Sequence, residues 1–427
     1  MNRFSYRMVW NLLAVAGFLA GCSNHDDDFY PNPKEEEPAE KPDPFVLKER
    51  QDIPIDRQQK EGVALQNDFA FRLFNADAVS NAQNSLISPL SMTMCLSMAA
   101  NGASEEVKRE IVERMLPDGG SMDDLNSLNR YLVSQLADVD NSSILTLANS
   151  VWVDKAFTLL PHFSETIKEY YNAESGALDM SSRQAADIIN QWVNSTTNGL
   201  IPTLFYAPPA CSMALINTMY FNGAWWDPFE EEFTEKGIFH NADGETKEVD
   251  FMHKNGNLFN MSITPEYSVL QLPYGNQAFS FYALLPAEGQ DLSLTPEKWA
   301  AIKKGMLPQC VNISVPKFEV AYDVTDLSAK MKEAGITKLF DTANPLQNTV
   351  TPQLPEGSLE MLHKTVFKVN EIGAEGAGLT AILWVTSPGP EYIPEPDPEI
   401  VLNRPFTYIV EEQSTGAILF IGAIRNL

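Results

Sequence analysis

Towards its C-terminus the chain reads Lys368-Val-Asn-Glu-Ile-Gly-Ala-Glu-Gly-Ala-Gly378, followed two residues later by Thr380-Ala-Ile-Leu-Trp-Val-Thr386. The first string ends in small residues, which disfavour a stable helix and let the backbone approach its neighbours closely. The second string is rich in β-branched and aromatic residues, which favour a strand. Every second residue from Ala374 to Trp384 is uncharged, while Glu375 falls on the opposite face. The pattern therefore predicts an exposed segment that can become a buried strand of a sheet.

The rest of the chain contains helix and strand patterns that do not alternate regularly. Apolar spacing and terminal signals predict helices at 63–74, 88–101, 105–115, 161–171, 183–197 and 326–334. Strand-like runs lie at 145–153, 214–221, 269–273, 279–285, 311–320, 366–370, 406–411 and 417–425. Helices and strands in separate clusters indicate the α+β class with largely antiparallel sheets.

Six strings along the chain resemble the serpin family in their order and spacing. They are Ile87–Met92, Leu215–Trp225, Val315–Phe318, Leu402–Phe406, Ile418–Ile424 and the Lys368–Gly378 stretch itself. The resemblance runs from about Gln58 to Leu427. It implies one serpin domain at 58–427, with three β-sheets, eight to nine helices and an exposed reactive-centre loop.

The resemblance also implies a function, because serpins inhibit serine proteases. In that family the protease attacks a bond of the exposed loop and forms an acyl-enzyme. The freed loop then inserts as a new strand of the central sheet and distorts the protease before water can release it. The expected partner is therefore a serine protease, with papain-like cysteine proteases as a second class of target. We expect an inhibitor and not an enzyme.

Individual site residues carry over from the family to matching positions of this chain. The hinge of the loop is expected at Glu371, Gly373, Ala374, Glu375, Gly376, Ala377 and Gly378. A polar cluster beneath the central sheet, the shutter, is expected at Ser88, Ser91, Asn149, Asn217 and His363, and a tryptophan where insertion begins, the breach, at Trp225. His363 is accordingly expected to form structural hydrogen bonds rather than to act as a catalytic base.

The hinge departs from the family pattern at two positions. Ala374 stands where Thr or Ser is usual, and Leu379 is bulkier than the usual small residue. Neither residue introduces a charge or a proline, so we expect inhibition to be retained.

The reactive bond is predicted near the end of the β-prone string. Counting from Glu371 as the family does leads to Ser387, but Pro388 follows it and most serine proteases do not cut before proline. The preferred bond is therefore Thr386–Ser387, with Val385–Thr386 as the alternative. Small and β-branched residues at the cut favour an elastase-like or subtilisin-like protease.

The N-terminus predicts export and lipidation. Residues 1–21 have a basic start and a short apolar run, which is typical of a signal peptide. The string Leu19-Ala20-Gly21-Cys22 resembles a bacterial lipobox, so Cys22 is the predicted lipidation site; an ordinary secretory signal is the alternative. Residues 22–57 form an acidic, proline-rich tether. We expect an outer-membrane lipoprotein that contacts the membrane only through its lipid, on the cell surface or on the periplasmic face.

Composition narrows the remaining functions. The formal charge is −27, from 57 acidic and 30 basic residues, which argues against a nucleic-acid partner. The sequence has no H-E-x-x-H, G-x-S-x-G or phosphate-loop motif and no metal-ligand spacing, so no metal or cofactor is expected. We expect a monomer. Two alternatives stay open: a serpin fold used as a non-inhibitory binding lipoprotein, and a hydrolase.

Overall fold

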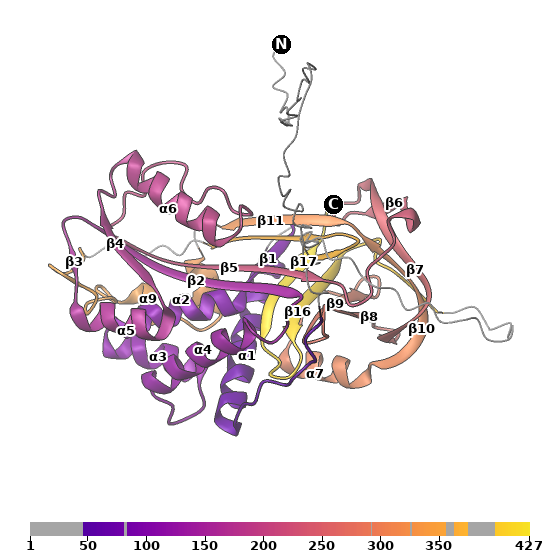
Figure 1. Ribbon diagram of the computed structural model, residues 1–427, viewed down its shortest axis with the longest axis horizontal. Coiled ribbons are helices and arrows are strands. Elements are labelled where there is room, and N and C mark those ends of the chain that lie inside the picture. Colours follow the sequence, from indigo (N-terminus) through magenta and orange to yellow (C-terminus); the bar gives the residue numbers. More distant parts are fainter. Residues whose placement is uncertain (1–45, 81–82, 292, 325–326, 356–362, 375–397) are drawn as a thin grey trace, which may run out of the picture. The chain divides into compact units, whose positions relative to one another are not determined.

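A computed structural model describes residues 46–427 except 81–82, 292, 325–326, 356–362 and 375–397. Within these ranges the chain forms nine α-helices and three β-sheets (Figure 1). The predicted α+β class, the three sheets and the helix number are confirmed. In this part of the chain no helix combines the length and apolar character that crossing a membrane requires.

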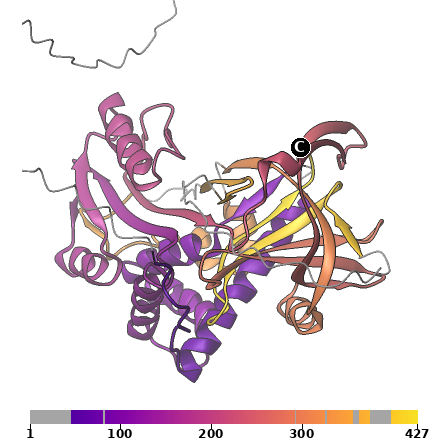
Figure 2. The same cartoon turned by 45° about the vertical axis from the view of Figure 1, so that its right-hand side comes forward.

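The helices gather mainly in the first half of the chain. They are α1 (Arg57–Ser80), α2 (Pro89–Asn101), α3 (Glu105–Met115), α4 (Met122–Leu136), α5 (Pro161–Tyr171), α6 (Arg183–Thr196), α7 (Pro296–Gly305), α8 (Ser328–Glu333) and α9 (Lys338–Asp341). Eleven of the thirteen residues of α2 are buried, which makes it the central helix. Its proline at the first position and Gly102 after its last residue are the favoured helix boundaries. In Figure 2, α1 and α2 lie along the yellow C-terminal strands, which α2 contacts through β17.

A six-stranded sheet has the order β11-β13-β14-β5-β2-β4. Its strands are β11 (Phe318–Val324), β13 (His363–Val369), β14 (Gly373–Ala374), β5 (Met213–Ala224), β2 (Ser143–Asp154) and β4 (Glu174–Leu178). The amphipathic helix α6 covers one face of this sheet, and α2 contacts the sheet through β5 (Figure 1). The strand β14 has only two residues, although it holds the place between two long strands. The middle of this sheet is therefore occupied by β14 at one end only, as far as the described residues show.

A nine-stranded sheet packs against the first and completes the core. Its strands are β1 (Ser85–Ile87), β6 (Thr234–His240), β7 (Thr246–Ile263), β8 (Tyr267–Pro273), β9 (Phe279–Pro286), β10 (Leu307–Pro316), β15 (Glu399–Val401), β16 (Phe406–Glu412) and β17 (Ile418–Ile424). Every residue of β9, β16 and β17 is buried. The third sheet is a two-stranded ribbon of β3 (Thr158–Leu159) and β12 (Val350–Thr351).

Stacked aromatic rings join the two large sheets. Phe367 of β13 lies parallel to Phe281 of β9, with ring centroids 6.4 Å apart, and 5.6 Å from Tyr408 of β16. Offset ring pairs of this kind add about 1 kcal/mol each beyond the area that they bury. The strand β13, which pairs with β14 in the middle of the six-stranded sheet, is thus fixed to the core beneath it.

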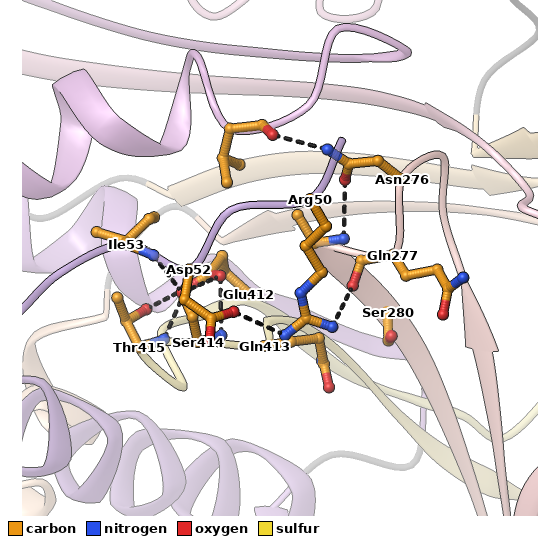
Figure 3. Close-up of polar contacts among 12 residues, drawn as sticks. Arg50, Asp52, Ile53, Asn276, Gln277, Ser280, Glu412, Gln413, Ser414 and Thr415 are labelled. Carbon is orange, nitrogen blue, oxygen red and sulfur yellow. Dashed lines mark hydrogen bonds and ion pairs between the residues drawn. The ribbon is translucent and has the colours of Figure 1, made fainter. Parts of the chain in front are cut away.

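Residues 46–56, which we call the strap, were expected in the tether but lie against the domain (Figure 3). Hydrogen bonds join Lys48 N to Asn141 Oδ1 (2.8 Å), Arg50 Nη1 to Gln277 O (3.1 Å) and Ile53 N to Ser414 Oγ (2.9 Å). The Ile53 side chain is 5% exposed and belongs to the main core. The folded unit therefore begins at Val46 and not at Gln58, because one apolar side chain and several backbone hydrogen bonds hold a segment whose composition resembles a linker.

Replacing Ile53 with alanine is expected to lower the free energy of unfolding by about 2–3 kcal/mol, because it removes buried methyl groups from the core. Denaturant unfolding of the purified chain measures this loss. Val46→Ala is the matched control within the strap, since Val46 is 75% exposed and its truncation should change stability by less than about 0.5 kcal/mol. Equal, small effects of both changes would contradict an anchoring role for Ile53.

Candidate functional site

The start of the predicted hinge lies between β5 and β13. Gly373 pairs with Ala224, and Ala374 pairs with Gly223 on one side and Val369 on the other, all antiparallel. The Ala374 side chain is 1% exposed. Among the described residues no ladder joins β5 directly to β13. Gly373 and Ala374 are therefore the only described residues that pair between β5 and β13.

Gly373 fits this position because it has no side chain. A Cβ atom there would lie 2.0 Å from the carbonyl oxygen of Gly223 and 2.9 Å from the Ala224 Cα. Such contacts are far inside van der Waals distance, so a larger residue would push the hinge away from β5. The small residues of the hinge thus serve close backbone approach at this point, as the sequence predicted.

Trp225 holds the turn that precedes the hinge. Its indole Nε1–H donates to the carbonyl oxygen of Asn370 at 2.9 Å, and its backbone N–H donates to the carbonyl oxygen of Ile372 at 2.8 Å. The ring itself is fixed, because it stacks on Tyr274 with centroids 4.4 Å apart. Asn370 closes the turn by accepting from the backbone N–H groups of Ile372 and Gly373. The predicted breach residue therefore contacts the hinge turn directly.

Glu371 is buried within the same turn and is held by two side chains. Lys317 Nζ and Thr234 Oγ1 both donate to Glu371 Oε1, each at 2.9 Å. Burial raises the pKa of Glu371, but the hydrogen bond from Lys317 and further hydrogen bonds outweigh burial and leave the pKa below its usual value. The carboxylate is therefore charged at neutral pH and ties the turn to β6 and to the connection between β10 and β11. Thr234 carried no signal in the sequence, and Lys317 lay within a serpin-like string without an assigned role.

Substituting Trp225 with phenylalanine is expected to destabilise the folded chain by about 1 kcal/mol, because phenylalanine cannot donate to the Asn370 carbonyl. Urea unfolding gives this value. Trp226→Phe is the control, because Trp226 is 52% exposed and is next in the sequence. If both variants unfold at the wild-type midpoint, the indole hydrogen bond contributes nothing measurable to the turn.

The predicted shutter residues fall into two hydrogen-bonded groups. In the first, Asn217 Nδ2 of β5 donates to Asn149 Oδ1 of β2 at 2.7 Å, and Asn149 Nδ2 donates to the Tyr171 carbonyl at 2.9 Å. In the second, His363 Nε2 of β13 lies 2.6 Å from Thr365 Oγ1 and accepts from the backbone N–H of Ser88 at 3.4 Å. Of these strands, β5 and β13 are the neighbours of β14.

The two groups approach each other through the start of α2. Ser88 Oγ lies 3.7 Å from the Met219 sulfur on β5. Ser91 is buried in the first turn of α2 and makes no hydrogen bond to the other four shutter residues among the described contacts. Asn217 Oδ1 is buried and has no hydrogen-bond partner in the part of the chain that the structure describes. The polar layer beneath β5 and β13 is thus incompletely paired.

Burial lowers the pKa of His363 to about 4, with the nearby Asp323 carboxylate opposing this shift. The imidazole is therefore neutral at physiological pH. Because Nε2 accepts from a backbone N–H, the ring proton lies on Nδ1. This arrangement suits a residue that forms structural hydrogen bonds, and that role for His363 stays a prediction.

Several predicted site residues lie outside the described residues. They are the lipidation site Cys22, the hinge residues Glu375, Gly376, Ala377 and Gly378, and the reactive-bond residues Val385, Thr386 and Ser387. Within the described ranges, no group of His, Cys, Asp or Glu side chains is arranged to hold a metal ion.

Comparisons with known proteins agree with this geometry. The family model described as serpin (serine protease inhibitor) matches residues 64–427. Serpin-Z2A of Triticum aestivum is 30% identical over 392 residues, covering 85% of this chain and 96% of that protein. An uncharacterized serpin-like protein of Thermococcus kodakarensis is 28% identical and covers 98% of this chain and 99% of its own length. The native structure of the thermophilic serpin tengpin matches with a TM-score of 0.74 at 30% identity, covering 89% of this chain and 97% of tengpin. The family model covers most of the chain and the relatives align over nearly their full length, so the chain belongs to the serpin family, whose members are generally serine protease inhibitors.

Proposed function

We propose that this protein inhibits serine proteases by trapping the acyl-enzyme, using its own cleaved loop as a new strand of the six-stranded sheet. The observation that carries the proposal is the pairing of Gly373 and Ala374 between β5 and β13. These residues begin an uncharged face that continues through Trp384 in the sequence. In the described part of the sheet, β5 and β13 lie on either side of Gly373 and Ala374, so the inserted strand could continue from these two residues.

The covalent chemistry is that of the target protease up to the point of insertion. The serine Oγ of the protease attacks the carbonyl carbon of Thr386, the bond to the Ser387 nitrogen breaks, and Ser387 leaves with a new amino terminus. Thr386 is then held as an ester to the protease. Insertion of the segment before it draws the protease away before water can hydrolyse that ester.

The free energy available from insertion is comparable to the stability of a domain. About ten new ladder hydrogen bonds contribute roughly 1 kcal/mol each. Burial of Ile382 and Trp384 adds about 2 kcal/mol for each side chain. The total exceeds about 10 kcal/mol, against the ~5–15 kcal/mol that stabilises a typical folded domain. Insertion can therefore deform the active site of an attached protease.

The proposed targets are elastase-like or subtilisin-like proteases, because Val385 and Thr386 are β-branched and carry no charge. Papain-like cysteine proteases are a second target class with the same acyl chemistry. The alternative function is that of a non-inhibitory binding lipoprotein with the same fold. The small, uncharged residues at Gly373 and Ala374 favour the inhibitor.

A denaturing gel tests the proposal. The exported chain carrying Cys22→Ser is mixed with an elastase, and we expect a band at the summed mass that resists denaturation, with Ser387 as the new amino terminus of the released fragment. The same mixture with an active-site serine-to-alanine elastase is the control and should give no such band. Cleavage without a covalent band across elastase, subtilisin, chymotrypsin and papain would leave the binding lipoprotein as the function.

We further propose that Cys22 is acylated and anchors the protein to the bacterial outer membrane, on the cell surface or on the periplasmic face. The support is the lipobox-like string before Cys22 and the acidic, proline-rich segment after it. Labelling with a fatty-acid analogue should mark the wild-type chain and not Cys22→Ser. Protease treatment of intact cells then separates the two faces, since only a surface-exposed chain is degraded.

A further inference from the structure

Exposed apolar side chains gather beside the breach. Trp226 is 52% exposed and Leu258 is 67% exposed, and both line one cavity of about 330 Å³. Pro308 lines the same cavity, and its neighbour Leu307 is 60% exposed. Single exposed apolar residues are ordinary on a protein surface, but a cluster around a cavity indicates a binding surface.

The cavity has an apolar floor and a rim with a few polar groups. The floor consists of the buried side chains of Trp225, Phe229, Phe259 and Leu272. The polar residues at the cavity are Asp227, Asn260, Gln271 and Gln277. A volume of this size with mostly aromatic and aliphatic walls is typical of sites for small organic ligands.

The cavity is electrically neutral although the chain carries a formal charge of −27. Its one carboxylate, Asp227, is paired with Lys254, whose Nζ lies 2.7 Å away and whose side chain is only 9% exposed. Asn257 Nδ2 also donates to Asp227, at 3.2 Å. The Lys254 ammonium is further held over the Phe229 ring, 5.4 Å from its centroid. An ionic ligand would find no unpaired opposite charge here, so the occupant is uncharged.

Two polar groups at the rim remain available to a ligand. Asn260 Nδ2 donates to Gln271 Oε1 at 3.0 Å, and Gln271 Nε2 donates to Ser280 Oγ at 2.9 Å, which fixes the two amide side chains. Within the described part of the chain, Asn260 Oδ1 and the Trp226 indole N–H make no hydrogen bond of their own. A ligand can therefore donate to the amide oxygen and accept from the indole.

We propose that this cavity binds an uncharged molecule with two aromatic ring systems and a hydrogen-bond donor. Its rings lie against Trp226 and Leu258 over the aromatic floor, and its donor reaches Asn260 Oδ1. The proposal goes beyond protease inhibition and does not depend on it. The site also has a structural link to the hinge, since the floor residue Trp225 donates to the Asn370 carbonyl.

The test uses N-phenyl-1-naphthylamine, a neutral fluorophore in which one N–H donor joins a naphthalene and a phenyl ring system, titrated into the exported chain carrying Cys22→Ser. We expect saturable fluorescence enhancement with one site per chain. Trp226→Ala and Leu258→Ser should each raise the dissociation constant by about tenfold or more, because each removes aromatic or apolar contact with the ligand. Both side chains are more than half exposed, so the variants are expected to keep the wild-type unfolding midpoint.

Two controls make the result specific. Ile144→Ser removes a side chain that is 54% exposed on β2, outside the cavity, and should leave the dissociation constant unchanged. An anilinonaphthalene sulfonate, with the same rings and a negative charge, should bind at least about tenfold more weakly. Absence of saturable binding, equal affinity in Trp226→Ala, or tighter binding of the sulfonate would each overturn the proposal.

Discussion

Replacing Ala374 with glutamate is expected to abolish formation of the covalent protease complex while leaving cleavage of the loop intact. Ala374 is 1% exposed and is paired on both sides, with Gly223 and Val369. A carboxylate in that position has no cationic partner, and burying an unpaired charge costs several kcal/mol. Insertion then becomes slower than hydrolysis of the acyl-enzyme. The protease is released active, so the variant behaves as a substrate.

The measurement is the number of inhibitor molecules consumed per protease molecule inactivated. We expect it to rise by about a hundredfold or more, which corresponds to about 3 kcal/mol of lost preference for insertion. Ala374→Ser is the matched control, because it is small and neutral and should remain close to the wild type. Cleavage confined to the loop, together with a wild-type unfolding midpoint, shows that Ala374→Glu is folded. A normal covalent complex formed by Ala374→Glu would show that a buried charge at this position does not hinder insertion, which would contradict the prediction.

Acidification is expected to destabilise the folded chain through His363. Burial places the folded-state pKa at about 4, against an ordinary value of 6.5 for the unfolded chain. Between these values the unfolded chain binds the proton more readily than the folded chain does. Stability from this residue is therefore complete above pH 6.5 and is lost progressively as the pH falls towards 4. The loss amounts to about 3 kcal/mol at the acid end of this range.

Thermal unfolding across this pH range measures the effect, and His363→Gln isolates it. Glutamine can accept from the Ser88 backbone N–H but does not titrate, so its stability should fall less steeply between pH 6.5 and 4. All other titratable groups are present in both proteins, so the difference between the two stability curves reports the replaced histidine. If the two proteins lose stability in parallel, His363 is not the group responsible.

Sequence reasoning identified the elements whose patterns are local. The apolar run, Pro89 and Gly102 predicted α2 within one residue. Several elements were missed, and α4 and β7 show two different reasons. Helix α4 begins at a capping box in which Ser121 and Asp124 bond each other's backbone N–H groups, and this serine–x–x–acid signal was present in the sequence. The long strand β7 is exposed along much of its length, so it has no apolar run to reveal it.

The sequence allowed the residue types of the candidate site to be predicted, but not the side chains that contact each other there. The small residues after Glu371 indicated close backbone approach, and Gly373 shows it against Gly223. The partners of Glu371 could not be predicted, because Lys317 and Thr234 are 54 and 137 positions away and are brought there by different strands. Separations of this size are fixed by sheet order, which no local pattern encodes.

The strap determines where a pulling force on the proposed lipid anchor would act on the folded domain. If Cys22 is acylated as proposed, the 23 residues between it and Val46 can span at most roughly 80 Å, the length of a fully extended chain. Tension along that segment would act first on the hydrogen bonds that join Lys48 and Val46 to Asn141. Asn141 lies in the connection between α4 and β2. This point of attachment is therefore separate in sequence from both β5 and β13, the two strands between which we propose that the loop inserts. Under the proposed mechanism, a pull on the lipid anchor is resisted by these hydrogen bonds with Asn141. It does not act directly on the strands between which the loop inserts.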